Sequence, residues 1–135
     1  MKKLLSTLVA LAALNLGGCA AVALTALGVG MATGVSHTLG GMVYKTFTTP
    51  QAQVKRATLG ALQRMQIKVV ESKRSGTTEV IRAKASDRDI DIELEALTPN
   101  TTRMVVVAKK DSGILRDGAT ATEVILQTEK IVGPN

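Results

Sequence analysis

The stretch from Asp89 to Ala96 constrains the fold most, because acidic and apolar residues alternate along it without a break. The acidic members are Asp89, Asp91, Glu93 and Glu95, and the apolar members are Ile90, Ile92, Leu94 and Ala96. Successive side chains of a strand point to opposite faces of a sheet, so this stretch predicts a strand with one buried and one wet face. Such one-sided burial is typical of antiparallel sheets.

Other strands are predicted on both sides of this stretch. They cover residues 44–48, 67–71, 79–85 and 103–109, and turn residues at 75–76, 86–87 and 98–101 separate the last four strands. Links this short require antiparallel neighbours.

Two helices are predicted from apolar stripes at helical spacing. Thr49 can cap the first helix, and Pro50 suits its first position. The second begins between Ile114 and Gly118, with Ser112 or Asp117 as its cap, and ends at Gly133-Pro134. The stripes are Val54, Ala57, Ala61, Leu62 and Met65 in the first helix, and Ala121, Val124, Ile125, Thr128, Ile131 and Val132 in the second.

The resulting order, β-α-β-β-β-β-α, predicts an α+β domain over residues 44–133. An antiparallel sheet of about five strands with two helices packed on one face is the economical way to bury these stripes. The 135-residue chain allows one such domain.

The N-terminus has the layout of a secretory signal peptide. Lys2 and Lys3 precede an apolar run from Leu4 to Leu16, and the small residues Gly17 and Gly18 come next. The only cysteine, Cys19, follows them directly. A lone cysteine in an exported protein has no disulfide partner, so this thiol calls for another explanation.

The run Leu16-Gly17-Gly18-Cys19 resembles the lipobox of bacterial lipoproteins. The resemblance implies cleavage between Gly18 and Cys19, removal of residues 1–18, and acylation of Cys19 with two or three chains of the palmitate type, which anchor a protein far more firmly than one. Ala20 stands where an aspartate is the usual inner-membrane retention signal, which implies the outer membrane, facing the periplasm. Two alternatives are ordinary cleavage near Ala21 or Ala23 and an uncleaved transmembrane anchor.

Residues 19–43 form a second apolar stretch that is rich in glycine. Ala26, Gly30 and Gly34 recur at four-residue spacing, which suits close helix packing in lipid. One interpretation is a membrane-inserted helix, and the other is a flexible or surface-lying tether, since glycine is costly in helices. His37 stands alone here, and we predict a loop histidine with no metal or catalytic role.

The acidic side of the 89–96 strand is the only dense charged feature. Asp89, Asp91, Glu93 and Glu95 would line one sheet face. Arg82 and Lys84, or Arg103 and Lys109, can form cross-strand ion pairs with them. A solvated, partly paired face is the first interpretation, a protein-docking face the second, and a calcium site the third.

Composition disfavours several functions. Tyr44 and Phe47 are the only aromatic residues, so stacking platforms for bases or sugars are not expected. The net charge of +6 falls to +4 when Lys2 and Lys3 are removed, and no basic block suggests nucleic acid. No Ser-His-Asp set and no complete phosphate loop is present, so we predict no catalytic residue, no metal and no cofactor.

These features together resemble a family of small bacterial lipoproteins whose shared region is a domain of unknown function. The resemblance covers the lipobox, the Gly/Ala-rich segment, the strand entering Thr49-Pro50, residues 67–71 and 99–103, and the closing helix. The element order is also similar to helix-grip domains of some envelope lipoproteins, including a subunit of the outer-membrane β-barrel assembly machine.

The expected function is that of a non-catalytic envelope lipoprotein, held to the membrane through acyl chains on Cys19, which docks on an envelope protein partner. The alternative is a carrier that binds a lipid or other apolar ligand between sheet and helices. Small residues such as Ala57, Ala61, Ala83 and Ala108 would leave the carrier a cavity, or would let the helices pack closely.

Overall fold

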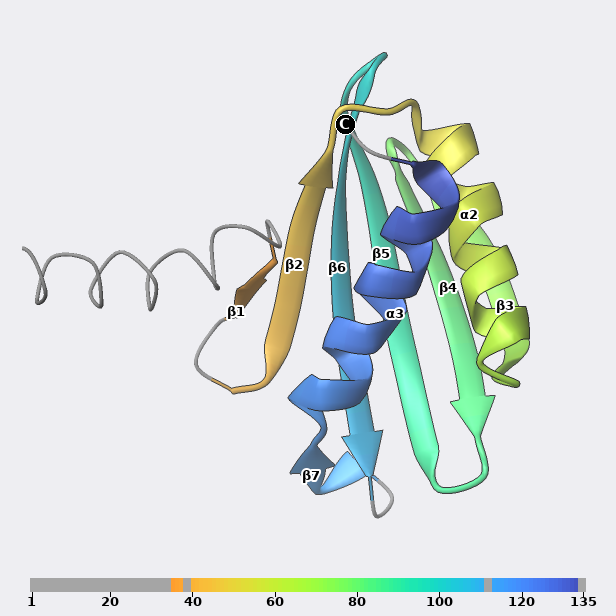
Figure 1. Cartoon of the computed structure of the whole chain (residues 1–135), viewed down its shortest axis with the longest axis vertical. Helices are drawn as coiled ribbons and strands as arrows, with labels where there is room; N and C mark the ends of the chain where they lie inside the picture. Colours follow the sequence, from red (N-terminus) through yellow and green to blue (C-terminus); the bar gives the residue numbers. More distant parts are fainter. Residues whose placement is uncertain (1–34, 38–39, 111–112, 134–135) are drawn as a thin grey trace, which may run out of the picture. The chain divides into compact units, whose positions relative to one another are not determined.

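The described part of the chain folds into a single antiparallel sheet with two helices (Figure 1). This computed structural model describes residues 35–37, 40–110 and 113–133. In chain order the elements are β1 (Ser36–His37), β2 (Met42–Phe47), α2 (Gln51–Arg64), β3 (Lys68–Ser75), β4 (Thr78–Ala85), β5 (Arg88–Thr98), β6 (Thr101–Lys110), β7 (Leu115–Arg116) and α3 (Gly118–Val132).

The strands lie in the order β1-β2-β6-β5-β4-β3, and β7 pairs with the end of β6. Strands β3 to β6 form a meander through two-residue turns, whereas β2 pairs with β6, the last long strand. Helix α2 therefore carries the chain from one side of the sheet to the other. All pairings are antiparallel, which confirms the predicted α+β class.

Strand β5 has the alternation that its sequence predicts. Ile90, Ile92 and Leu94 are buried, while the acidic side chains between them lie on the opposite face. Strand β6 behaves in the same way, with Met104 and Val106 buried and Val105 half-buried on the other side. Side-chain alternation thus gives β5 and β6 a helix side and an open side.

Both helices cover the same face of the sheet, α3 over β6 and β2 and α2 beside it (Figure 1). Their apolar stripes meet the strands in one cluster that contains Phe47, Val54, Leu62, Ile92, Met104 and Ile125. Where the helices approach each other, a Cβ built on Gly60 would lie 3.3 Å from Cδ1 of Ile131. A larger residue than glycine would therefore crowd this helix contact.

The helix caps agree with the sequence in one case and differ in the other. Asp117 caps α3, as predicted, and its side chain accepts a hydrogen bond from the backbone N–H of Thr120 at 3.1 Å. The N-cap position of α2 is Pro50 and not Thr49, and it makes no side-chain cap hydrogen bond. Thr49 instead accepts, through its carbonyl oxygen, a 2.8 Å hydrogen bond from the hydroxyl of Thr102 on β6.

The folded domain begins before residue 44. Met42 and Val43 belong to β2, and Ser36–His37 forms β1, so part of the segment interpreted as a tether is in the sheet. The backbone of His37 pairs with Val43, which corrects the prediction of a loop. Strands as short as β1 and β7 leave no periodic pattern in a sequence. Within the described residues, neither helix is long and apolar enough to cross a membrane.

Candidate docking face of the sheet

The side of the sheet away from α2 and α3 carries no helix within the described part of the chain. We call it the open face (Figure 1). Side chains from β2, β4, β5 and β6 alternate onto it, and they include the predicted acidic row. An exposed sheet face with both charged and apolar side chains is the candidate site of this molecule.

The acidic row of β5 is paired mainly with basic residues on the neighbouring strands, as the sequence predicts. The ion pairs of the row are Asp89–Lys84 (3.7 Å), Asp91–Arg82 (3.8 Å), Asp91–Lys109 (3.0 Å) and Glu95–Arg103. All these side chains are at least three-tenths exposed, so each pair contributes little to stability. They neutralise three of the four carboxylates of the row.

Glu93 is the exception in the row. Its cross-strand neighbours are Val80 on β4 and Val105 on β6, neither of which can pair with a carboxylate. The described residues provide no ion pair or hydrogen bond to its side chain. The row therefore contains one exposed carboxylate that faces solvent between two valines.

Glu93 lies in a depression of about 520 Å³ on the open face. The residues that line it are Met42, Tyr44, Thr78, Glu93, Glu95, Arg103 and Val105. Met42 and Tyr44 are large apolar side chains, 40% and 37% exposed. The depression combines apolar side chains with one unpaired carboxylate, and we name it the Glu93 depression.

The calcium interpretation gains no support from this geometry. A straight row on a strand spreads its carboxylates apart. Within residues 35–37, 40–110 and 113–133, no three His, Cys, Asp or Glu side chains converge enough to hold a metal ion. Asp89, Asp91 and Glu95 also already have a lysine or arginine partner.

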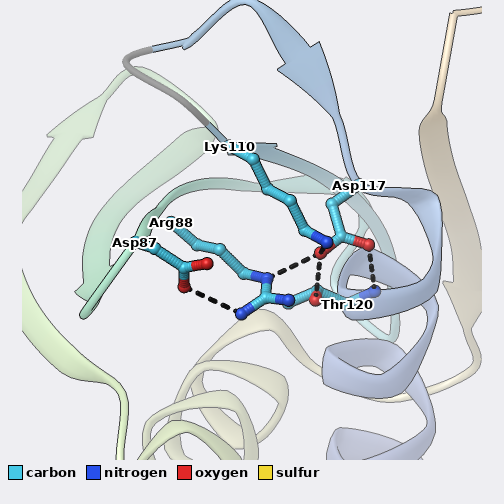
Figure 2. A network of polar contacts seen from close by, with 5 residues as sticks. All are labelled: Asp87, Arg88, Lys110, Asp117 and Thr120. Carbon is cyan, nitrogen blue, oxygen red and sulfur yellow. Dashed lines mark hydrogen bonds and ion pairs between the residues drawn. The ribbon is translucent and has the colours of Figure 1, made fainter.

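A second polar cluster lies where the β4–β5 turn and the end of β6 approach the start of α3. Figure 2 shows the carboxylate of Asp117 among Arg88, Lys110 and Thr120. Nε of Arg88 donates to Asp117 at 2.6 Å, and Nζ of Lys110 lies 3.5 Å from the same oxygen. The hydroxyl of Thr120 donates to Asp117 at 2.6 Å, and Arg88 also pairs with Asp87 at 2.9 Å.

The ionisation of Asp117 follows from these contacts. Burial raises the pKa of its carboxyl group, but hydrogen bonds from Thr120 and Arg88 and the charge of Lys110 outweigh burial and hold the pKa well below its usual value. The hydrogen bond with Asp117 raises the pKa of the Arg88 guanidinium. Because all its neighbours stabilise the charged form, the carboxylate of Asp117 is a poor acid, base or nucleophile. The role of the cluster is structural: its contacts fix the start of α3 to the sheet.

Two more ion pairs hold the helices on the sheet, and neither was predicted from the sequence. On the helix side of β2, Nζ of Lys45 lies 2.7 Å from Glu129 of α3 and 5.6 Å from the centre of the Phe47 ring. Lys55 of α2 pairs with Glu79 of β4. The hydrogen bond from Lys55 is the main reason that the pKa of Glu79 is lowered. The sequence offered one signal for these pairs, because Lys45 and Glu79 are charged residues at helix-facing positions of their strands.

Several predicted residues lie outside the described part of the chain. They are the cleavage pair Gly18 and Cys19 and the small residues Ala26, Gly30 and Gly34.

Fold and site together define a class: a small α+β domain whose antiparallel sheet is covered by helices on one face and carries a depression on the other. The chain belongs to the family described as "Protein of unknown function (DUF3568)", whose model matches residues 2–109. The match includes the N-terminal region and β1 to β6, whereas β7 and α3 follow it. No curated protein matches the chain.

Proposed function

We propose that this protein is a lipid-anchored lipoprotein of the bacterial envelope whose α+β domain is a non-catalytic docking module. The observation that carries the docking role is the Glu93 depression, where apolar side chains and an unpaired carboxylate are exposed together. The domain's other charged clusters are internally paired and hold the helices on the sheet.

The anchoring part of the proposal rests on the sequence. Cys19 follows Leu16-Gly17-Gly18 directly, and it is the chain's only cysteine. The family match covers residues 2–109, which include this N-terminal stretch. Two or three acyl chains on Cys19 would hold the domain at a bilayer. Ala20, in place of aspartate, favours the outer membrane and a domain that faces the periplasm.

The docking role is preferred to that of a carrier, which would bind a lipid or another apolar ligand between the sheet and the helices. A carrier needs space inside the domain, and its small core residues would have to leave that space. Ala61 and Ala108 are fully buried, and Gly60 packs against Ile131. These small residues favour close packing of the helices over a cavity.

Site-specific crosslinking in cells tests the docking role. A photo-crosslinking amino acid at Thr46, which is exposed on the open face beside Arg103, should trap one envelope protein reproducibly. The matched control places the same amino acid at Arg64, which is exposed on α2. Equal capture from both positions, or none from Thr46, would count against docking. A small molecule that co-purifies reproducibly in native mass spectrometry would favour the carrier.

A further inference from the structure

We propose that the Glu93 depression binds a protein segment that presents one lysine or arginine side chain between apolar side chains. The carboxylate of Glu93 would accept the cation, and Tyr44 and Val105 would contact the apolar flanks. This inference names the chemistry of the partner and rests on the docking function proposed above.

The first step of the argument is the charge pattern of the open face. The carboxylates of Asp89, Asp91 and Glu95 each have a basic residue opposite them. Only at Glu93 are both opposite positions on β4 and β6 apolar. Within the acidic row, Glu93 is therefore the one carboxylate without a basic partner, and it lies inside the depression.

The second step concerns the free energy needed to remove water from the carboxylate of Glu93. A partner that covers the depression removes water from Glu93, and an unpaired carboxylate is expensive to desolvate. For a purely apolar partner, the free energy needed to desolvate Glu93 would thus offset part of the binding free energy gained by contact with Tyr44 and Val105. A lysine or arginine at that position pairs the charge while its neighbours bury the apolar surface.

The third step compares the partner classes. Arg103 also lines the depression, but its charge is taken by Glu95, so the unmatched charge is negative. Anionic lipid headgroups and nucleic acids would be repelled by Glu93. A single carboxylate is too few ligands for a metal ion. A second copy would bring another Glu93 to the same interface. A basic and apolar protein segment fits these features best.

Tyr44 provides the measurement, because it is the only tyrosine and the chain has no tryptophan. The full-length protein, extracted in detergent, would be titrated with the synthetic peptide Gly-Ser-Val-Lys-Val-Ser-Gly while tyrosine emission is recorded. A saturable change in emission is expected. The same peptide with glutamate in place of lysine should give no saturable change.

Two variants locate the effect. Glu93→Gln removes the charge and keeps the shape, and it should weaken binding of the lysine peptide by about tenfold. The matched control is Asp89→Asn, on the same strand and face but paired with Lys84 and outside the depression. It should change binding by less than about twofold. A thermal melt of each variant checks that both remain folded.

The proposal is overturned if the lysine peptide gives no saturable change, if the glutamate peptide binds equally well, or if Glu93→Gln binds like wild type. It is also overturned if Tyr44 emission responds to vesicles of anionic phospholipid and not to peptide, or if the open face pairs with a second copy in sedimentation. The titration does not depend on the membrane anchor. A chain that binds the peptide but is not acylated would refute the anchoring alone.

Discussion

At the scale of single residues, Asp117 links three elements of the fold. Its carboxylate caps α3 and also faces Arg88 and Lys110, so one side chain joins the helix start to two strands (Figure 2). Asp117→Ala should lower the free energy of unfolding by about 2 kcal/mol, since it removes the cap and leaves Arg88 without its closer partner. Urea unfolding followed by circular dichroism measures this change.

The matched control for this substitution is Asp87→Ala. Asp87 also pairs with Arg88, but its side chain is 60% exposed, and it caps no helix. Its loss should cost less than about 0.5 kcal/mol. Equal losses for the two variants would mean that the pairing with Arg88, and not the cap and burial of Asp117, determines the stability of this corner.

The pH dependence of stability follows from the lowered pKa of Asp117. A carboxyl group whose pKa is lower in the folded than in the unfolded state stabilises the protein above its unfolded pKa, about 4. The contribution is lost as the pH falls toward the folded value. The stability advantage of wild type over Asp117→Asn should therefore decrease as the pH is lowered from 5 to about 3, and part of it should remain at about pH 3. A difference in melting temperature that stays constant over this range would contradict the account.

At the scale of elements, the turn between β1 and β2 depends on two neighbouring glycines with different surroundings. Gly40 and Gly41 both have positive φ, at 106° and 75°. A Cβ on Gly41 would lie 2.7 Å from Cβ of Arg116 in β7, whereas a Cβ on Gly40 would meet nothing within 4 Å. The space beside Gly41 is thus required by the packing of the turn against β7.

Alanine at each glycine separates backbone strain from this contact. Gly40→Ala should cost about 1 kcal/mol, because its φ disfavours an L-residue. Gly41→Ala should cost about 1–3 kcal/mol more, because the methyl group must displace β7 or the turn. Urea unfolding of both variants gives the comparison. Equal losses would show that the contact with Arg116 does not constrain the turn.

The sequence was informative about these elements wherever the signal is local. The alternation from Asp89 to Ala96 and the cap at Asp117 depend on neighbours in the chain, and both are confirmed. Strands β1 and β7 have two residues each and so carry no period, and the pairing of β2 with β6 joins segments about 60 residues apart, as Tyr44 with Val105.

The Glu93 depression was harder to predict, because it depends on strand register. The register of β5 and β6 shifts between Ala96 and Thr98. Counting back from the Thr98–Thr101 pair without this shift would place Val106 opposite Glu93. The shift places Val105 there instead. Alternation along the strand puts Val105 and Val107 on the face of the carboxylates, but which residue lies directly opposite Glu93 depends on this register.

At the scale of the whole molecule, the proposed leader precedes a domain with one covered and one open sheet face. Ala20→Asp should move the protein from the outer to the inner membrane in an enterobacterial host, because it introduces the retention residue after Cys19. Ala20→Ser is the control and should leave the distribution unchanged. Density-gradient separation of the two membranes gives the result, and an unchanged distribution for Ala20→Asp would contradict outer-membrane sorting by this residue.

The most direct test of the central claim is metabolic labelling with an alkyne fatty acid, combined with fractionation, for wild type and Cys19→Ser. The wild-type protein should carry the label, run as the processed form and be found in the membrane fraction. The variant should carry no label, keep its leader as a larger precursor and be missing from the outer membrane. A variant that is processed, labelled and sorted like wild type would contradict the claim that Cys19 is the anchor.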